Sequence, residues 1–280
     1  MAEEASMSLA DDELVITAAI VGAEVTRAQN PHVPYSAEEI ATEAARCADA
    51  GAAVIHLHVR EPDGTPTQSA AAFQAAIEAI RARCDVVIQV STGGAVGMDV
   101  EERLGGLACA PEMATLNCGS TNFGDAVFVN AVPDVRQIAR RIAQIGATPE
   151  LEVYEVGHLD LAMSLLDEGV VASHAWLQFV LGVPGAAGAR ESVLRFMISE
   201  LGRPLHWSVA AVGRHQLPMA ALACELGGHP RVGLEDNLFL RRGVLAEGSA
   251  PLVERAAELA RERGRQVVSA GHLRGVLTAP

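Results

Sequence analysis

The sequence contains no lysine: all 21 of its Lys and Arg positions are arginine. Enzymes that form a Schiff base, hold pyridoxal phosphate, carry biotin or bind nucleotides through a P-loop need a lysine amine, so chemistry of these kinds is excluded. Only 4% of the residues are aromatic, and no apolar run is long enough to cross a membrane. The formal net charge of −14 repels nucleic acid and anionic membranes, so we expect neither as a partner.

Cysteines are few and their number is odd. None belongs to a C-x-x-C pair, which argues against a disulfide framework and favours reduced, mostly buried thiols in a cytoplasmic protein. The cysteines are Cys47, Cys84, Cys109, Cys118 and Cys224. Residues 1–13 are acidic and unlike a signal peptide, and we expect them to form an N-terminal arm.

Short β-branched apolar runs alternate with alanine-rich helical patterns along nearly the whole chain. The runs predict eight strands, at 14–21, 53–59, 86–92, 113–118, 150–156, 174–181, 206–213 and 231–236. The helical patterns lie at 36–51, 69–84, 99–109, 133–146, 158–169, 191–202, 216–228 and 251–264. The first of them begins with a serine cap and has glutamate three residues later, which is typical of a capping box.

Eight strand–helix units without an intervening linker predict an α/β fold of a single domain, a (β/α)8 TIM barrel over residues 14–264. The tail at 265–280 is expected to pack on the barrel or on a neighbouring subunit. In such a barrel the chemistry lies at the carboxyl ends of the strands and in the loops that follow them.

Two histidines stand at the end of the second predicted strand. Alternation puts His56 and His58 on one face, as two metal ligands require; two histidines satisfied by polar neighbours are the alternative. Glu235 and Asp236 stand at the end of the last strand, which closes against the first, so Glu235 can reach the histidine pair. Arg231 lies four residues before Glu235 and leans to the same face. A helix cap is the alternative for the two acidic residues.

Other polar residues follow the remaining strands. Glu24 lies in the loop after the first strand, where a solvated carboxylate is the alternative. Ser91 and Gly94 belong to a segment that resembles an anion cradle, although S-T-G-G also suits an ordinary turn. Thr115 and Asn117 share a face of the fourth strand and can hold a carboxylate or carbonyl group.

Three further features carry weaker signals. Glu152 alternates with Tyr154 on the fifth strand and lies deep enough to support a histidine ligand; a structural salt bridge is the alternative. The glycine-rich loop after the sixth strand precedes a helix, so its amides can meet phosphate, and Arg190 adds positive charge there; simple loop flexibility is the alternative. Arg241 and Arg242 are expected on a solvated face.

Eight blocks, in order from about residue 14 to residue 240, resemble the β-keto acid cleavage enzymes: GAEVTR, HLHVREPDG, QVSTGG, PEMATLNCGSTNFG, ELEVYEVGHL, LQFVLGVPGA, WSVAAVGR and VGLEDNL. The resemblance implies a zinc-dependent (β/α)8 barrel. It also implies that the protein condenses a β-keto acid with acetyl-CoA to give acetoacetate and a new acyl-CoA, and that it forms a homotetramer.

The resemblance further implies a role for each motif. The implied zinc ligands are His56, His58 and Glu235, with Glu152 supporting the metal site. The residues implied to assist proton removal are Arg231 and Asp236. The implied substrate contacts are Glu24, Ser91, Gly94, Thr115 and Asn117.

Physical chemistry also favours a metal, because a barrel without lysine cannot hold a carbanion as an enamine and must stabilise an enolate electrostatically. Two other functions stay open: a metal-dependent aldolase, lyase or hydrolase acting without CoA, and a non-catalytic metal- or metabolite-binding barrel. The substrate stays open too. Glu24 suits a cationic β-keto acid, whereas Arg27 or Arg60 would suit an anionic diacid.

Overall fold

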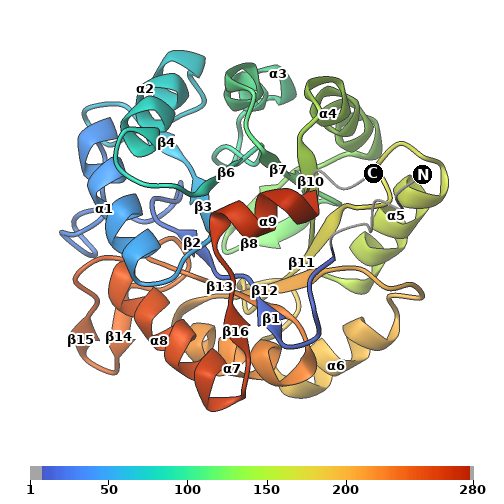
Figure 1. Ribbon diagram of the computed structural model, residues 1–280. Helices are drawn as coiled ribbons and strands as arrows, with labels where there is room; N and C mark the ends of the chain where they lie inside the picture. The colour runs from blue at the N-terminus through green and yellow to red at the C-terminus, as the bar shows by residue number, and fades with distance from the viewer. Residues whose placement is uncertain (1–7, 278–280) are drawn as a thin grey trace, which may run out of the picture.

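The computed structural model describes residues 8–277, so residues 1–7 of the expected N-terminal arm lie outside the described residues. The centre of the molecule is a closed barrel of eight parallel strands (Figure 1), which confirms the predicted fold. In barrel order these strands are β2 (Thr17–Ala19), β3 (Val54–Leu57), β6 (Val87–Val90), β7 (Met113–Asn117), β10 (Thr148–Val153), β11 (Trp176–Leu181), β12 (Trp207–Ala211) and β13 (His229–Val232).

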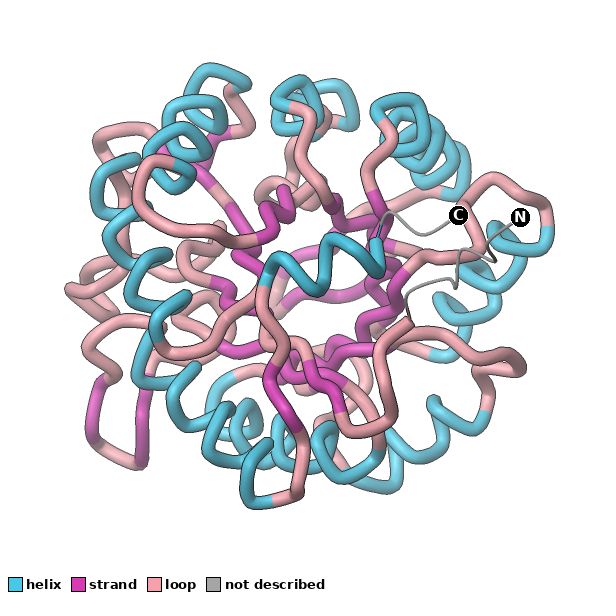
Figure 2. Tube along the Cα trace, viewed as in Figure 1, coloured by secondary structure: helices cyan, strands magenta, loops and turns pink. Residues whose placement is uncertain are grey.

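Helices surround this barrel on the outside (Figure 2). They are α1 (Ala37–Asp49), α2 (Ala70–Arg81), α3 (Val100–Arg103), α4 (Val132–Ile145), α5 (Val156–Asp167), α6 (Glu191–Ser199), α7 (Gln216–Leu226) and α8 (Ala250–Glu262). The expected capping box begins α1: the Ser36 side chain accepts from the Glu39 backbone, and the Glu39 side chain accepts from the Ser36 backbone. The helix buries Ile40 and Ala44 from one apolar stripe, which holds it against the core.

One expected helix is broken. The pattern at 99–109 forms the short α3 and a separate 3-10 helix, η1 (Gly105–Cys109). Gly105 lies directly against the backbone before α2, where an added Cβ atom would be 1.8 Å from the carbonyl oxygen of Gln68. The break coincides with this close approach, which only glycine allows because it has no Cβ atom.

The two ends of the described chain meet at the amino-terminal end of the barrel. The expected first strand divides into β1 (Glu13–Leu14) and β2, and β1 pairs in parallel with β16 (Gln266–Val267) outside the barrel. Helix α9 (Ala270–Leu277) then crosses in front of the barrel in Figure 1. Its Leu273 packs in one buried cluster with Val54, the first residue of β3. The tail therefore covers the end of the barrel opposite the carboxyl ends of the strands.

Short hairpins follow three of the barrel strands on the carboxyl side. They are β4 (Val59–Arg60) with β5 (Pro66–Thr67), β8 (Thr121–Phe123) with β9 (Ala126–Phe128), and β14 (Phe239–Arg241) with β15 (Val244–Leu245). A 3-10 helix, η2 (Gly213–His215), follows β12. Across residues 8–277 no helix has both the length and the apolar character that crossing a membrane requires. All five cysteines are free thiols.

Candidate active site

The carboxyl ends of the barrel strands open into a cavity of about 380 Å³. Aromatic side chains from two of the hairpins contribute to its wall: Phe123, Phe128 and Phe239. Its charged and histidine side chains are Glu24, His56, His58, Glu152, Arg231, Glu235 and Asp236. A concave, largely apolar site with a few convergent polar groups is typical of small-molecule binding.

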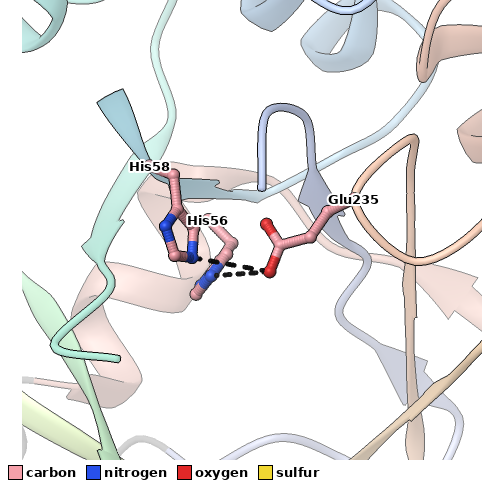
Figure 3. A group of neighbouring side chains, drawn as sticks. All are labelled: His56, His58 and Glu235. Atoms are coloured by element: carbon pink, nitrogen blue, oxygen red, sulfur yellow. Dashed lines mark ion pairs between the residues drawn. The ribbon is translucent and has the colours of Figure 1, made fainter. Parts of the chain in front are cut away.

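His56, His58 and Glu235 converge in this cavity (Figure 3). The Oε1 atom of Glu235 lies 3.4 Å from Nε2 of His56 and 3.6 Å from Nε2 of His58. His56 extends from β3, His58 follows directly after it, and Glu235 lies in the turn after β13. All three side chains are largely buried. The expected meeting of strand two with strand eight therefore occurs at the mouth of the barrel.

A buried hydrogen-bond chain fixes the His56 ring. Nδ1 of His56 lies 2.7 Å from Oε1 of Gln89, on the adjacent strand β6. The amide nitrogen of Gln89 donates to Oε2 of Glu150 at 2.9 Å, so the amide oxygen must accept from His56. In the neutral imidazole this assignment places the ring proton on Nδ1 and leaves the Nε2 lone pair directed at the cluster. Sequence reasoning missed both Gln89 and Glu150.

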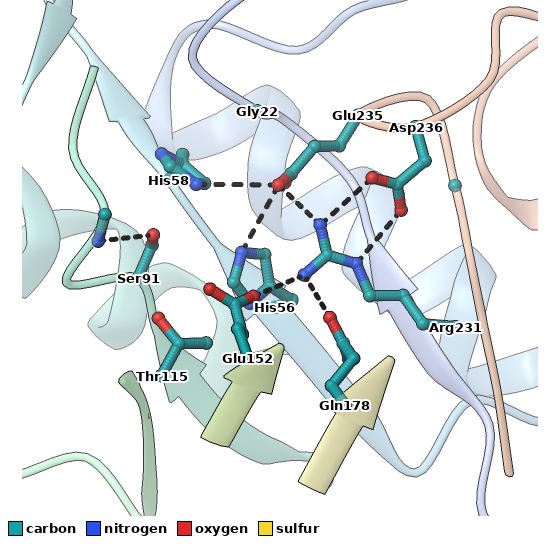
Figure 4. A network of polar contacts seen from close by, with 12 residues as sticks. Gly22, His56, His58, Ser91, Thr115, Glu152, Gln178, Arg231, Glu235 and Asp236 are labelled. Carbon is teal, nitrogen blue, oxygen red and sulfur yellow. Dashed lines mark hydrogen bonds and ion pairs between the residues drawn. The ribbon is translucent and has the colours of Figure 1, made fainter. Parts of the chain in front are cut away.

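Arg231 lies at the centre of a network of carboxylates and an amide beside the histidine cluster (Figure 4). Its Nε donates to Oδ2 of Asp236 at 2.9 Å and its Nη2 to Oδ1 at 3.1 Å, a bidentate pair. Nη2 also donates to Oε1 of Glu235 at 2.6 Å. Nη1 faces Oε1 of Glu152 at 3.4 Å and Oε1 of Gln178 at 3.2 Å. The guanidinium group thus connects the candidate metal cluster to a buried carboxylate beside it.

A sharp turn after β13 brings Glu235 and Asp236 into the cavity. Gly233 has a φ of +145°, and an added Cβ atom would lie 2.1 Å from the carbonyl oxygen of Ala19 on the neighbouring strand β2. Only glycine fits this contact. The backbone N–H of Glu235 then donates to the same Ala19 oxygen at 3.1 Å, so the turn is anchored to β2.

Burial and neighbouring charges shift the pKa values of these groups in opposite directions. Burial raises the pKa of Glu152 to about 7, and the attraction of Arg231 offsets part of that rise. Burial raises the pKa of Asp236 in the same way. Burial also acts on Glu235, but Arg231 and the two imidazoles outweigh it and hold the pKa well below its usual value. Burial lowers the pKa of His58 to about 4, so this imidazole is neutral near pH 7.

The expected substrate residues lie in two layers. Glu24, Ser91, Gly94 and Asn117 line the cavity, and Glu24 is exposed at its mouth. Ser91 Oγ accepts from the backbone N–H of Gly93 at 3.1 Å, and Oδ1 of Asn117 is buried without a partner among the described residues. Thr115 is fully buried and is not a cavity-lining residue.

Thr115 instead holds the segment that carries Ser91. Its hydroxyl accepts from the backbone N–H of Thr92 at 3.2 Å, and its carbonyl accepts from the Thr92 hydroxyl at 2.7 Å. Glu152 also differs from the expectation, because its ion-pair partner is Arg231 and the histidine partner is Gln89. The register explains why: His56 is paired with Gln89 across β3 and β6, whereas Glu152 stands on β10.

The barrel fold and the cluster of two histidines and a carboxylate define a barrel enzyme with a candidate metal site. A family model described as beta-keto acid cleavage enzyme matches residues 13–278. The chain belongs to this family.

Curated relatives agree with the family match. The 3-keto-5-aminohexanoate cleavage enzyme of Fusobacterium nucleatum is 49% identical over 269 residues, covering 95% of this chain and 98% of that protein. The 3-oxoadipate:acetyl-CoA acetyltransferase of Cupriavidus necator is 36% identical, covering 95% of both chains. Among solved structures, ObcA in complex with oxaloacetate aligns with a TM-score of 0.74 at 22% identity. That alignment covers 87% of this chain and 66% of the ObcA chain, and it supports the fold.

Proposed function

We propose that this enzyme exchanges acyl groups between a β-keto acid and acetyl-CoA, giving acetoacetate and a new acyl-CoA, at a site built to hold zinc. The observation that carries the proposal is the meeting of His56, His58 and Glu235 beside the Arg231–Asp236 pair in one cavity. The names of the relatives, which include acetyl-CoA transferases acting on keto acids, support the co-substrate.

The three side chains suit a divalent metal. Two imidazole nitrogens and one carboxylate oxygen form a common catalytic zinc donor set, and tetrahedral ligands at zinc stand about 3.3 Å apart for bonds of about 2.0–2.1 Å. The separations of 3.4 and 3.6 Å between Glu235 and the two imidazoles agree with this spacing. Oε2 of Glu235 is also buried without a partner in the described chain. A bound zinc ion would polarise the keto oxygen and keep positions open for substrate.

The surrounding residues position and deprotonate the substrate. Ser91, Gly94 and Asn117 hold its carboxylate, while Thr115 fixes the backbone beneath them. Asp236, oriented by two N–H groups of Arg231, removes a proton from the methylene group between the keto and carboxylate groups.

The carbon–carbon bond exchange that follows needs only the β-keto acid and acetyl-CoA. The methylene carbanion attacks the thioester carbonyl of acetyl-CoA, and the CoA thiolate leaves. The thiolate attacks the former ketone carbonyl, and cleavage of the bond between that carbon and the former methylene carbon releases acetoacetate and the new acyl-CoA. Asp236 returns its proton to the departing carbanion.

The side chain of the β-keto acid is cationic in this proposal. Arg27 pairs with Glu39, and Arg60 is buried with its guanidinium group on the carbonyl oxygens of Gly22 and Val25, so both arginines already have partners. Glu24 at the mouth remains as a partner for an amino group. The two relatives named 3-keto-5-aminohexanoate cleavage enzyme, at 49% and 46% identity, support the same substrate class.

The test is acetoacetate release by the zinc-loaded protein from acetyl-CoA and a panel of cationic, neutral and anionic β-keto acids. Release should require acetyl-CoA and be fastest with the amino-substituted acid. Cleavage that proceeds equally without acetyl-CoA would favour a metal-dependent aldolase or hydrolase instead. The variant H56A/H58A should lose zinc and activity together, and activity retained without metal would overturn the assignment of the site.

We also propose that the protein acts as a homotetramer in the cytoplasm. Exposed apolar side chains away from the cavity, including Val127 on the β8–β9 hairpin and Phe196 on α6, offer surface for subunit contacts. The free cysteines suit a reducing compartment. Light scattering coupled to gel filtration tests the assembly, and a monomeric mass would overturn it.

A further inference from the structure

Four arginines stand on the consecutive loops that follow β11, β12 and β13 at the carboxyl end of the barrel. Arg190 ends the loop after β11, Arg214 lies in η2 after β12, and Arg241 and Arg242 belong to the β14–β15 hairpin after β13. We call these four residues the arginine rim. All four are exposed, and no carboxylate of residues 8–277 forms an ion pair with them.

The three loops form one continuous wall that reaches the reaction site. The backbone N–H of Val212 donates to the Leu181 carbonyl at 3.0 Å, and that of Gly213 donates to the Asp236 carbonyl at 2.7 Å. Strand β14 lies against η2. The cavity is also lined by Gly213, which precedes Arg214, and by Phe239, which lies two residues before Arg241. A ligand lying on the rim can therefore extend into the cavity beside Asp236.

The charge of the rim contrasts with that of the molecule. The chain has a net charge of −14 and no lysine, so exposed arginines without carboxylate partners mark places that attract an anion. Guanidinium groups bind phosphate oxygens through two parallel hydrogen bonds. The loops after strands seven and eight are also where (β/α)8 barrels frequently bind phosphate, and β12 and β13 are strands seven and eight of this barrel.

We propose that the arginine rim binds the phosphate groups of CoA, with Arg241 and Arg242 as its outer pair, so that the thioester end of acetyl-CoA enters the cavity beside Asp236. This inference rests on the proposed function for the identity of the co-substrate. It assigns binding energy to the part of acetyl-CoA that does not react, and it leaves the β-keto acid to the residues around the metal cluster.

The test compares two thioesters: acetyl-CoA, which carries the phosphate groups, and acetyl-pantetheine, which carries none. For each protein the readout is the ratio of kcat/KM for acetyl-CoA to kcat/KM for acetyl-pantetheine. R241A/R242A and R190A/R214A should each lower this ratio at least tenfold, mainly through KM. The matched control is R140A/R141A, which removes two exposed arginines that are likewise adjacent in sequence, from α4 on the outside of the barrel. Its ratio should equal that of the wild type.

Two results would overturn the rim. One is a ratio and a kcat/KM for acetyl-CoA that are both unchanged in the two rim variants, and the other is an unchanged ratio with an equal loss on both thioesters, which would indicate damage to the reaction site. Calorimetric binding of adenosine 3′,5′-bisphosphate separates this inference from the proposed function. If the wild type releases no acetoacetate but binds this nucleotide more tightly than R241A/R242A, the proposed reaction is wrong and phosphate binding by the arginine rim is supported. Equal binding by both proteins would refute phosphate binding by the arginine rim.

Discussion

Replacing Gln89 with methionine should weaken metal binding although none of the three candidate metal ligands is replaced. The substitution keeps the length of the side chain but removes the acceptor for Nδ1–H of His56 and one of the donors to Glu150. The imidazole proton is then free to move to Nε2, where it competes with the metal. Losing such an outer partner of a histidine ligand typically costs 10–100-fold in metal affinity, about 1.4–2.7 kcal/mol. Zinc titration against a chromophoric chelator measures the change.

The chain supplies a matched control in Gln178. Its amide nitrogen donates to the same Oε2 atom of Glu150, at 3.0 Å against 2.9 Å for Gln89, and both side chains are completely buried. Gln178→Met should therefore destabilise the fold by a similar amount, on the order of 1–3 kcal/mol for a buried group left without its partner. Gln178 accepts from Arg231 rather than from His56, so zinc affinity should stay near the wild-type value while kcat falls about tenfold.

The pair of variants separates positioning from general damage. Thermal unfolding in metal-free buffer should show similar losses for both, whereas zinc affinity should fall for Gln89→Met alone. Wild-type zinc affinity in Gln89→Met would refute the argument that Gln89 sets the His56 tautomer. An equal loss of zinc affinity in both variants would instead show that the effect comes from a weakened barrel interior.

Three other substitutions test separate parts of the structure. Asp236→Asn should keep zinc bound while kcat falls about 100-fold or more, as expected for a lost general base, and an unchanged kcat would clear Asp236 of that role. Glu24→Gln should raise KM for an amino-substituted β-keto acid more than for a neutral one, and equal changes would remove Glu24 from substrate recognition. Burial lowers the pKa of His229 to about 3, and its Nδ1 accepts from the backbone N–H of Val15, so below pH 6.5 the unfolded chain binds a proton that the folded chain does not. Unfolding free energy should then fall by up to about 1.4 kcal/mol per pH unit as the pH drops from 6.5 toward 3, and His229→Asn, which keeps an acceptor but does not titrate, should remove that slope; identical slopes would contradict it.

The sequence predicted the parts of the site that depend on short-range regularity. Alternation along one strand put His56 and His58 on one face, and the structure places both imidazoles in the cavity. Strand order in a closed barrel brought strand eight beside strand one, so that Glu235 could meet them. The hydrophobic pattern located all eight barrel strands, although the first divides at its start because β1 pairs with the tail rather than with the barrel.

What could not be predicted depends on register between strands. Gln89 is opposite His56, and Glu152 is opposite Gln178, only because of the stagger of each strand against the next. A single strand sequence carries no record of that stagger, so the expectation gave Glu152 the histidine and passed over Gln89. A usable signal was present all the same: Gln89 and Gln178 are polar residues in otherwise apolar strands, and such residues need buried partners.

Glu150 explains how one buried group can orient both halves of the site. Its carboxylate accepts hydrogen bonds from the amide nitrogens of Gln89 and Gln178 and from the hydroxyl of Ser208, and it can donate none. Each glutamine must therefore turn its nitrogen toward Glu150 and its oxygen away. One oxygen then accepts from Nδ1–H of His56 and the other from Arg231. One buried glutamate side chain in the barrel interior thereby sets the tautomer of a candidate metal ligand and the orientation of the arginine that holds the candidate base.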